Sequence, residues 1–243
     1  MRKPFELDVA VGTNARTTAL VYAAGGADDA PVGAALVLGH GAGAGQHSAF
    51  MVEFAHALAD LGIDVITFNF LYTERGRRLP DRGTALEDCY GAVIREAREH
   101  VDTARRTLFI GGKSMGGRIA TQVAAADATL PVAGLVLLGY PLHPPGQRDR
   151  LRDGHLPLIH RPMLFVQGTR DAFGTPEELA PILARLAPVP LVYAVDNGDH
   201  SFKLQKRDPM RQAEVFRSIQ QAIVGWIAAT APGFTARERA GGR

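Results

Sequence analysis

The residues with the clearest chemical potential lie in the stretch Gly112-Lys113-Ser114-Met115-Gly116, which has the pattern G-x-S-x-G. The apolar residues 108–110 before it indicate a short buried strand, and residues 118–125 after it have apolar positions three and four apart, as in a helix. A serine at such a strand-to-helix turn is held in a strained conformation that exposes its hydroxyl group. The pattern predicts that Ser114 is a nucleophile. The alternative is an ordinary loop, because glycine and serine are common there.

The same residues raise a second alternative, a phosphate-binding P-loop, because Gly112-Lys113-Ser114 resembles the end of that motif. The P-loop requires a glycine five positions before its Gly-Lys-Ser. Position 107 is a threonine, so the P-loop is excluded.

A glycine-rich run, residues 39–45, follows the apolar strand predicted at residues 34–38. It does not have the spacing of a dinucleotide-binding fingerprint, because the positions that would need glycine hold Ala44 and Gln46. The end of the next predicted strand, Asn69, also lacks the acidic residue that would bind a ribose. A nucleotide site is therefore not expected here.

Small residues in this run would instead let the backbone approach an oxygen atom that becomes negative during a reaction. We predict that the backbone amides of Ala42 and Met115 form an oxyanion hole. The alternative is a tight turn between a strand and a helix. His40, in the same run, is predicted to be a structural hydrogen-bonding residue rather than a catalytic base.

The composition indicates one globular domain without a strong charge preference. The chain has 243 residues, of which 46% are hydrophobic, so it is long enough for one well-filled core. We predict a single domain over residues 1–234 and a flexible polar tail over 235–243. The net charge of +2, from 27 basic and 25 acidic residues, gives no field that would attract nucleic acid or an anionic membrane.

Cys89 is the single cysteine of the chain. It cannot form an internal disulfide, and one thiol does not make a metal motif, so no metal or other cofactor is expected. The N-terminal residues lack the apolar stretch of a signal peptide, and no run approaches the length of a membrane span. We therefore expect a cytoplasmic protein that does not associate with membranes.

Strands alternate with helices along most of the chain, after an opening hairpin over residues 5–23. This order predicts an α/β fold, a mostly parallel twisted sheet of about seven or eight strands with helices on both faces. The connection 141–160 is too short for a separate lid, which predicts an open site. The loop 71–83 contains four arginines that could recognise an anionic substrate group or lie in solvent, and solvent exposure is favoured: Arg75, Arg77, Arg78 and Arg82.

Such sheets bind ligands at the carboxyl ends of their strands. Three chemically distinctive residues follow predicted strands in the order Ser114, Asp171 and His200. A serine hydroxyl is a weak nucleophile until a base accepts its proton, so we predict His200 as that base and Asp171 as the acid that orients it. His200 could instead be a structural loop residue beside Asp199. The acid could instead be one of three other residues: Asp149, Asp153 and Asp196.

With these motifs the chain resembles the α/β-hydrolase superfamily, and within it the dienelactone-hydrolase-like branch that includes bacterial predicted hydrolases and testis-expressed hydrolase-like proteins. The resemblance covers roughly residues 35–230 and implies a capless hydrolase core with Ser114, Asp171 and His200 as its triad. Dienelactone hydrolases use a cysteine nucleophile where this chain has Ser114, so their ring-opening reaction is not implied. The matching segments are His40–Gly43, Gly111–Arg118, Gly139–His143, Leu151–Asp153, Gly168–Asp171 and Asp199–Ser201.

The sequence thus predicts a serine hydrolase, similar to carboxylesterases or thioesterases, that cleaves a small ester or thioester through an acyl-enzyme. The alternative from another class is a binding or scaffold protein that keeps the fold without useful catalysis. A third interpretation, nucleic-acid binding through the arginines of residues 75–82, would require salt-dependent retention on DNA. Acyl chain length and oligomeric state do not follow from the linear pattern.

Overall fold

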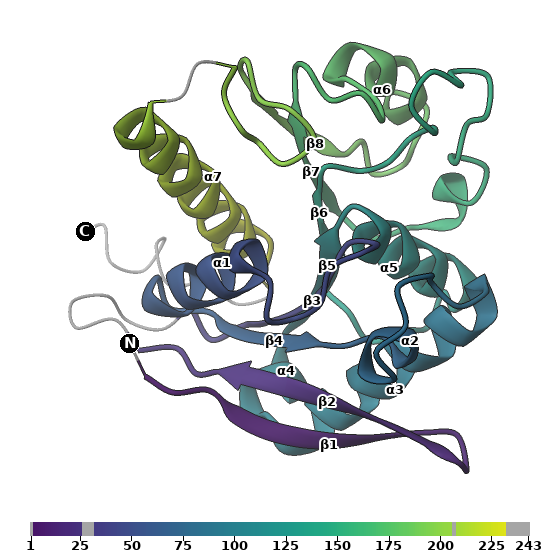
Figure 1. Cartoon of the computed structure of the whole chain (residues 1–243), viewed down its shortest axis with the longest axis vertical. Helices are drawn as coiled ribbons and strands as arrows, with labels where there is room; N and C mark the ends of the chain where they lie inside the picture. The colour runs from purple at the N-terminus through teal and green to yellow at the C-terminus, as the bar shows by residue number, and fades with distance from the viewer. Residues whose placement is uncertain (1, 26–31, 206–207, 232–243) are drawn as a thin grey trace, which may run out of the picture.

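The computed structural model describes residues 2–25, 32–205 and 208–231, and their strands form one eight-stranded sheet with helices on both faces (Figure 1). The strand order is β1-β2-β4-β3-β5-β6-β7-β8. β1 and β2 form an antiparallel hairpin, β2 pairs antiparallel with β4, and all later pairs are parallel. The predicted fold class and opening hairpin are confirmed.

The elements run along the chain as follows. The strands are β1 (Phe5–Val11), β2 (Ala15–Tyr22), β3 (Ala35–Gly39), β4 (Asp64–Phe68), β5 (Leu108–Lys113), β6 (Gly134–Leu138), β7 (Met163–Gly168) and β8 (Leu191–Val195). The helices are α1 (Ala49–Asp60), α2 (Leu71–Glu74), α3 (Gly83–His100), α4 (Asp102–Arg106), α5 (Met115–Ala126), the 3₁₀ helix η1 (Leu156–Leu158), α6 (Pro176–Leu183) and α7 (Pro209–Thr230).

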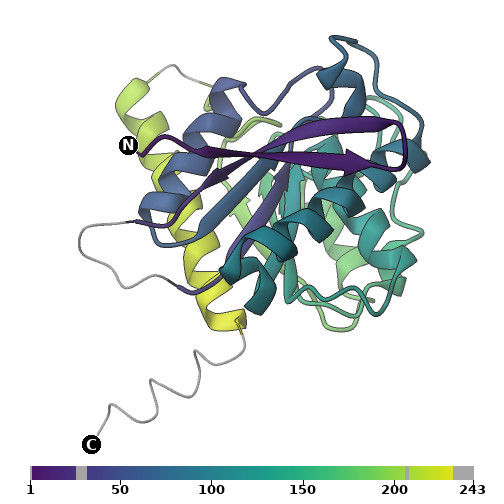
Figure 2. The same ribbon diagram turned by 90° about the horizontal axis from the view of Figure 1, so that it is seen from below.

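Two apolar clusters lie on the two faces of the sheet. One contains residues of α1 and α7, and the other contains residues of α3, α5 and α6. Figures 1 and 2 show α1 and α7 side by side on one face, with α3 and α5 on the other. The four strands β3, β5, β6 and β7 are buried along their whole length, as expected for strands covered on both sides.

Two glycines of the G-x-S-x-G motif lie against the end of β3. A Cβ atom at Gly112 would lie 2.4 Å from the carbonyl oxygen of Gly39, and one at Gly116 would lie 2.2 Å from the same oxygen. These distances are too short for any side chain. The absence of side chains at both positions therefore allows the turn after β5 to contact the end of β3.

Short elements were harder to predict than long ones. Residues 71–74 form the four-residue helix α2 inside the predicted loop 71–83, and α4 follows α3 as a separate turn. Helix α6 has a well-defined start, since Thr175 and Glu178 form a capping box around its first residue, Pro176. The predicted tail 235–243 lies outside the described residues.

In the described part of the chain, no helix has both the length and the apolar character needed to cross a membrane.

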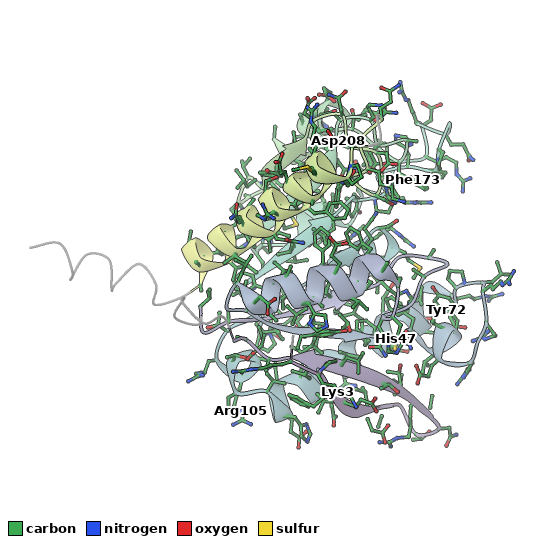
Figure 3. All side chains as sticks on the ribbon, turned by 60° about the vertical axis from the view of Figure 1, so that its left-hand side comes forward. Lys3, His47, Tyr72, Arg105, Phe173 and Asp208 are labelled. Carbon is green, nitrogen blue, oxygen red and sulfur yellow. The ribbon has the colours of Figure 1, made fainter. Side chains whose placement is uncertain are left out.

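Strand direction places chain segments at opposite ends of the molecule. Figure 3 shows Tyr72 and Phe173, which follow β4 and β7, on the side away from Arg105, which precedes β5.

Tyr90 on α3 connects the helix layer to the strand that carries Ser114. Its buried hydroxyl lies 2.9 Å from the oxygen of Val37 and 2.6 Å from that of Gly111, and it accepts a hydrogen bond from the Gly111 amide at 2.9 Å. Tyr90→Phe should lower the free energy of unfolding in urea by about 1–3 kcal/mol, because buried polar atoms on β3 and β5 lose their partner. Tyr193→Phe is the matched control: Tyr193 is half-buried and should tolerate the change. Equal effects of both changes would contradict this interpretation.

Candidate active site

The side chains of Ser114, His200 and Asp171 meet at the carboxyl ends of the parallel strands. The Oγ of Ser114 lies 2.8 Å from Nε2 of His200, and Nδ1 of His200 lies 2.8 Å from Oδ2 of Asp171. A carboxylate at Nδ1 favours the tautomer with its proton on Nδ1, which leaves Nε2 free to accept the serine proton. The arrangement can therefore move a proton away from the Ser114 hydroxyl.

Ser114 occupies the turn between β5 and α5 with backbone angles φ 52° and ψ −115°. A positive φ at a serine costs on the order of 1–3 kcal/mol and persists only where the surroundings hold it. The amide of Ser114 donates to the carbonyl of Leu138 at the end of β6 (2.9 Å), which fixes the turn to the neighbouring strand. The sheet thus holds Ser114, which is half-buried at the cavity, in the strained backbone conformation that the motif predicted.

Asp171 follows β7, and its carboxylate is completely buried. Oδ2 accepts from the side-chain amide of Gln167 at 2.9 Å, and Oδ1 accepts from the backbone amide of Phe173 at 2.8 Å. Gln167 is itself fully buried and also bonds the backbone of Tyr140. The carboxylate is therefore fixed in the direction of His200.

The loop that carries His200 is held from three sides. Oδ1 of Asp199 accepts from the amides of Ser201 (2.8 Å) and Lys203 (2.9 Å), which closes the turn around the histidine. The ring of Phe173 packs against the imidazole with centroids 4.2 Å apart. Nζ of Lys113 donates to the carbonyl of His200 at 2.6 Å.

Lys113 is the residue directly before Ser114, and only 8% of it is exposed. Its ammonium group lies 5.7 Å from the ring centroid of Phe202 and 6.0 Å from that of Phe50. No ion pair holds it within the described residues. Burial lowers the pKa of Lys113 to about 8, while the charges of Asp171 and Asp199 act in the opposite direction.

A cavity of about 700 Å³ opens above Ser114 and His200. Ala42 and Met115 also line it, and neither backbone amide has an acceptor among the described residues. Two unpaired amides beside a nucleophile are available to bind an oxygen of a ligand. The cavity wall is mainly apolar and includes Phe50, Met51, Leu86, Phe173 and Phe216.

The alternative acids lie elsewhere. Asp149 and Asp196 are exposed, and Asp153 makes no side-chain contact with His200. His40 is fully buried, and its Nε2 accepts from the amide of Phe70 at 3.2 Å. Burial also lowers the pKa of His40, which suits a neutral structural residue.

Two groups of charged residues lie outside the cavity. The four arginines of the loop 71–83 are exposed and do not line it: Arg75, Arg77, Arg78 and Arg82. Glu96, Glu99 and His100 lie close enough on α3 to share a cation, but they are mostly exposed and are not part of the cavity wall. Sequence patterns did not indicate the supporting roles of Gln167 and Lys113, because both depend on partners far away in the chain.

Residues 32–228 match the model of the alpha/beta hydrolase domain family, and the chain belongs to this family. The match covers most of the chain and includes every residue of the candidate site. The predicted superfamily is thereby confirmed, and membership supports a hydrolase. The resemblance to testis-expressed proteins stays a prediction.

Solved structures share the fold along almost their whole length. A protein from Xanthomonas campestris, described as a serine hydrolase without lid, is 22% identical with a TM-score of 0.69, covering 93% of this chain and 96% of that one. A dienelactone hydrolase from Anabaena variabilis is 20% identical with a TM-score of 0.71, covering 95% and 100%. Est1E from Butyrivibrio proteoclasticus is 11% identical with a TM-score of 0.69, covering 92% and 99%. At these identities the likeness concerns the fold.

The burial of Lys113 predicts how the free energy of unfolding depends on pH. Because the folded state has the lower pKa, it releases the lysine proton first, and the unfolded state binds more protons between about pH 8 and 10. The free energy of unfolding of the wild type should therefore rise relative to Lys113→Met by roughly 2 kcal/mol as the pH rises from about 7.5 to 10. Urea unfolding at several pH values measures this difference.

The control for this experiment is Lys3→Met, since Lys3 is exposed near the N-terminus. The difference between the wild type and Lys3→Met should not change with pH. If the difference between the wild type and Lys113→Met is equally constant, this would contradict a buried Lys113 with a lowered pKa.

Proposed function

We propose that this protein is a serine hydrolase that cleaves a small ester or thioester through an acyl-enzyme. The observation that carries the proposal is the continuous hydrogen-bonded chain from Ser114 through His200 to Asp171 at the base of an apolar cavity. Ser114 is the nucleophile, His200 the general base and acid, and Asp171 the group that orients the imidazole.

The first half of the reaction forms the acyl-enzyme. Oγ of Ser114 attacks the carbonyl carbon of the substrate while its proton passes to Nε2 of His200. The carbonyl π electrons move to oxygen, which gives a tetrahedral intermediate. When this collapses, the bond to the leaving oxygen or sulfur breaks, and His200 returns the proton to the leaving group.

The second half repeats these steps with water. His200 takes a proton from a water molecule whose oxygen attacks the acyl carbon. The bond between this carbon and Oγ of Ser114 then breaks, and His200 returns the proton to Oγ. The buried carboxylate of Asp171 stabilises the imidazolium that forms in each half, because its negative charge lies next to the positive charge on His200. The products are a carboxylic acid and an alcohol or thiol.

The backbone amides of Ala42 and Met115 are proposed to bind the oxygen that becomes negative in the tetrahedral intermediate. Neither amide has an acceptor in the described chain, and both residues line the cavity that contains Ser114. A donor placed for this purpose lowers the barrier by on the order of 3 kcal/mol.

The size and apolar wall of the cavity favour a compact uncharged ester bond with a small organic group on either side. Neighbours with this fold include Est1E, which is known with ferulic acid bound, and an esterase from Pyrococcus furiosus. They support ester chemistry for this chain. Two further statements stay predictions: that the protein is cytoplasmic and that it has no nucleic-acid partner. The choice between an oxygen ester and a thioester stays open.

Ser114→Ala should abolish hydrolysis of short p-nitrophenyl esters and labelling by a fluorophosphonate probe, because it removes the nucleophile. Ser218→Ala is the matched control, since Ser218 lies exposed on α7 outside the cavity. The control should retain both activities. Wild-type protein that is folded by circular dichroism and yet takes no label would contradict the proposed function.

Asp171→Asn should reduce kcat by roughly 10³ to 10⁴, because a neutral amide neither fixes the tautomer of His200 nor stabilises its charged form. Asp149→Asn and Asp196→Asn test the alternatives, and both should stay within about two-fold of the wild type because both residues are exposed. Steady-state kinetics with p-nitrophenyl butyrate compares the variants. A large loss in either control, together with a mild effect at Asp171, would assign the acid elsewhere.

A further inference from the structure

Two arginines line the same cavity as Ser114 and His200 and take no part in the proposed proton transfers. Arg118 lies on the first turn of α5, and its backbone amide donates to the carbonyl of Ser114 at 3.1 Å. Arg152 lies in the connection between β6 and β7. Two chain segments that are distant in sequence therefore bring a guanidinium group to the wall beside the nucleophile.

Arg152 is held in place by three hydrogen bonds, two to its backbone and one from its side chain. Its amide donates to the carbonyl of Leu142 at 2.8 Å, and its carbonyl accepts from the hydroxyl of Tyr140 at 2.6 Å. Its Nη1 donates to the carbonyl of Pro141 at 3.3 Å. The connection is irregular, but it presents this arginine in a defined position.

The two guanidinium groups are half-buried and lack a counter-ion. Burial lowers the pKa of Arg152, and the positive charge of Arg118 lowers it further, so the two charges act on each other. Neither forms an ion pair with a carboxylate anywhere in residues 2–25, 32–205 or 208–231. Like charges that are partly removed from water destabilise the protein unless an anion compensates them.

Acidic residues of the cavity wall do not provide that compensation. Asp81 is engaged with Arg77, and Glu53 lies on α1, which covers the opposite face of the sheet from α5. Asp153 follows Arg152 in the chain but forms no ion pair in the described structure. His155, between these groups, bonds the hydroxyl of Thr121, and burial together with Arg118 lowers its pKa.

We propose that Arg118 and Arg152 bind an anionic oxygen group, a carboxylate or a phosphate, carried by the substrate that is cleaved at Ser114. The inference rests on the proposed function and gives its substrate class, an ester or thioester with a second, negatively charged end. A planar guanidinium group presents parallel N–H donors that match the oxygens of such an anion. The apolar part of the wall would then contact the chain between the two ends.

The test compares two p-nitrophenyl esters whose acyl chains have the same number of carbon atoms, the neutral pentanoate and the anionic mono-glutarate. The wild type should cleave the glutarate ester with a kcat/KM at least about ten-fold higher, the ratio expected for one or more charged hydrogen bonds. Arg118→Gln and Arg152→Gln should each remove most of this preference. The control Arg150→Gln changes an exposed arginine of the same connection and should keep it.

Two outcomes would overturn the inference. One is a wild type without preference for the glutarate ester. The other is a loss in the two variants that is equal for both esters, which would indicate a structural role. Inhibition of the wild type at constant ionic strength then separates the anions: stronger inhibition by glutarate indicates a carboxylate substrate, and stronger inhibition by inorganic phosphate indicates a phosphate-bearing one.

A binding measurement distinguishes failure of this inference from failure of the proposed function. If the wild type cleaves neither ester and takes no fluorophosphonate label, the proposed function fails. Calorimetry with the Ser114→Ala variant then decides. If this variant binds glutarate or phosphate, and the binding is lost when Arg118→Gln or Arg152→Gln is combined with Ser114→Ala, the result supports the anion site. Absence of binding by both anions overturns it.

Discussion

The contact between the end of β3 and the turn after β5 is the constraint on which the site depends. Gly39 pairs with Gly112 in the parallel ladder, and its carbonyl occupies the space that side chains at Gly112 and Gly116 would need. The loop after Gly39 therefore leaves its strand beside Ser114, and Ala42 lines the same cavity. One backbone contact positions both Ser114 and the loop that contains Ala42, so a side chain at either glycine would displace both.

Buried polar side chains extend this arrangement to the other strand ends. Gln167 on β7 bonds the backbone of Tyr140 after β6 and the carboxylate of Asp171, and Lys113 on β5 bonds the carbonyl of His200 after β8. Each bond contributes little net stability, about 0.5–1.5 kcal/mol, but leaving such a buried group unpaired costs more. The loops after four neighbouring strands are consequently ordered together, which is what holds the imidazole within reach of both partners.

Much of the fold and the placement of Ser114 and His200 could be predicted because their signals are local. A buried strand is a continuous apolar run and an amphipathic helix has apolar residues three and four apart, so each can be recognised within its own segment. Ser114 and His200 lie in recognisable turns at predicted strand ends. The helix α2 was missed because four residues make only about one helical turn, which is too short to show a repeating pattern. The choice of Asp171 over other acids, and the roles of Gln167 and Lys113, depend on partners that only the folded chain brings together; Lys113 and the carbonyl it binds are 87 residues apart.

The distribution of arginines follows from the same physics and agrees with the solvent exposure that the sequence favoured for the arginines of residues 75–82. Four arginines within residues 75–82 repel one another, and such a group is tolerated where water solvates each charge, which is where the structure has them. A partly buried cation is less well solvated, so its charge is costly unless an anion lies nearby. The two arginines proposed to bind an anion, Arg118 and Arg152, are far apart in sequence, and the fold rather than local density brings them to one cavity.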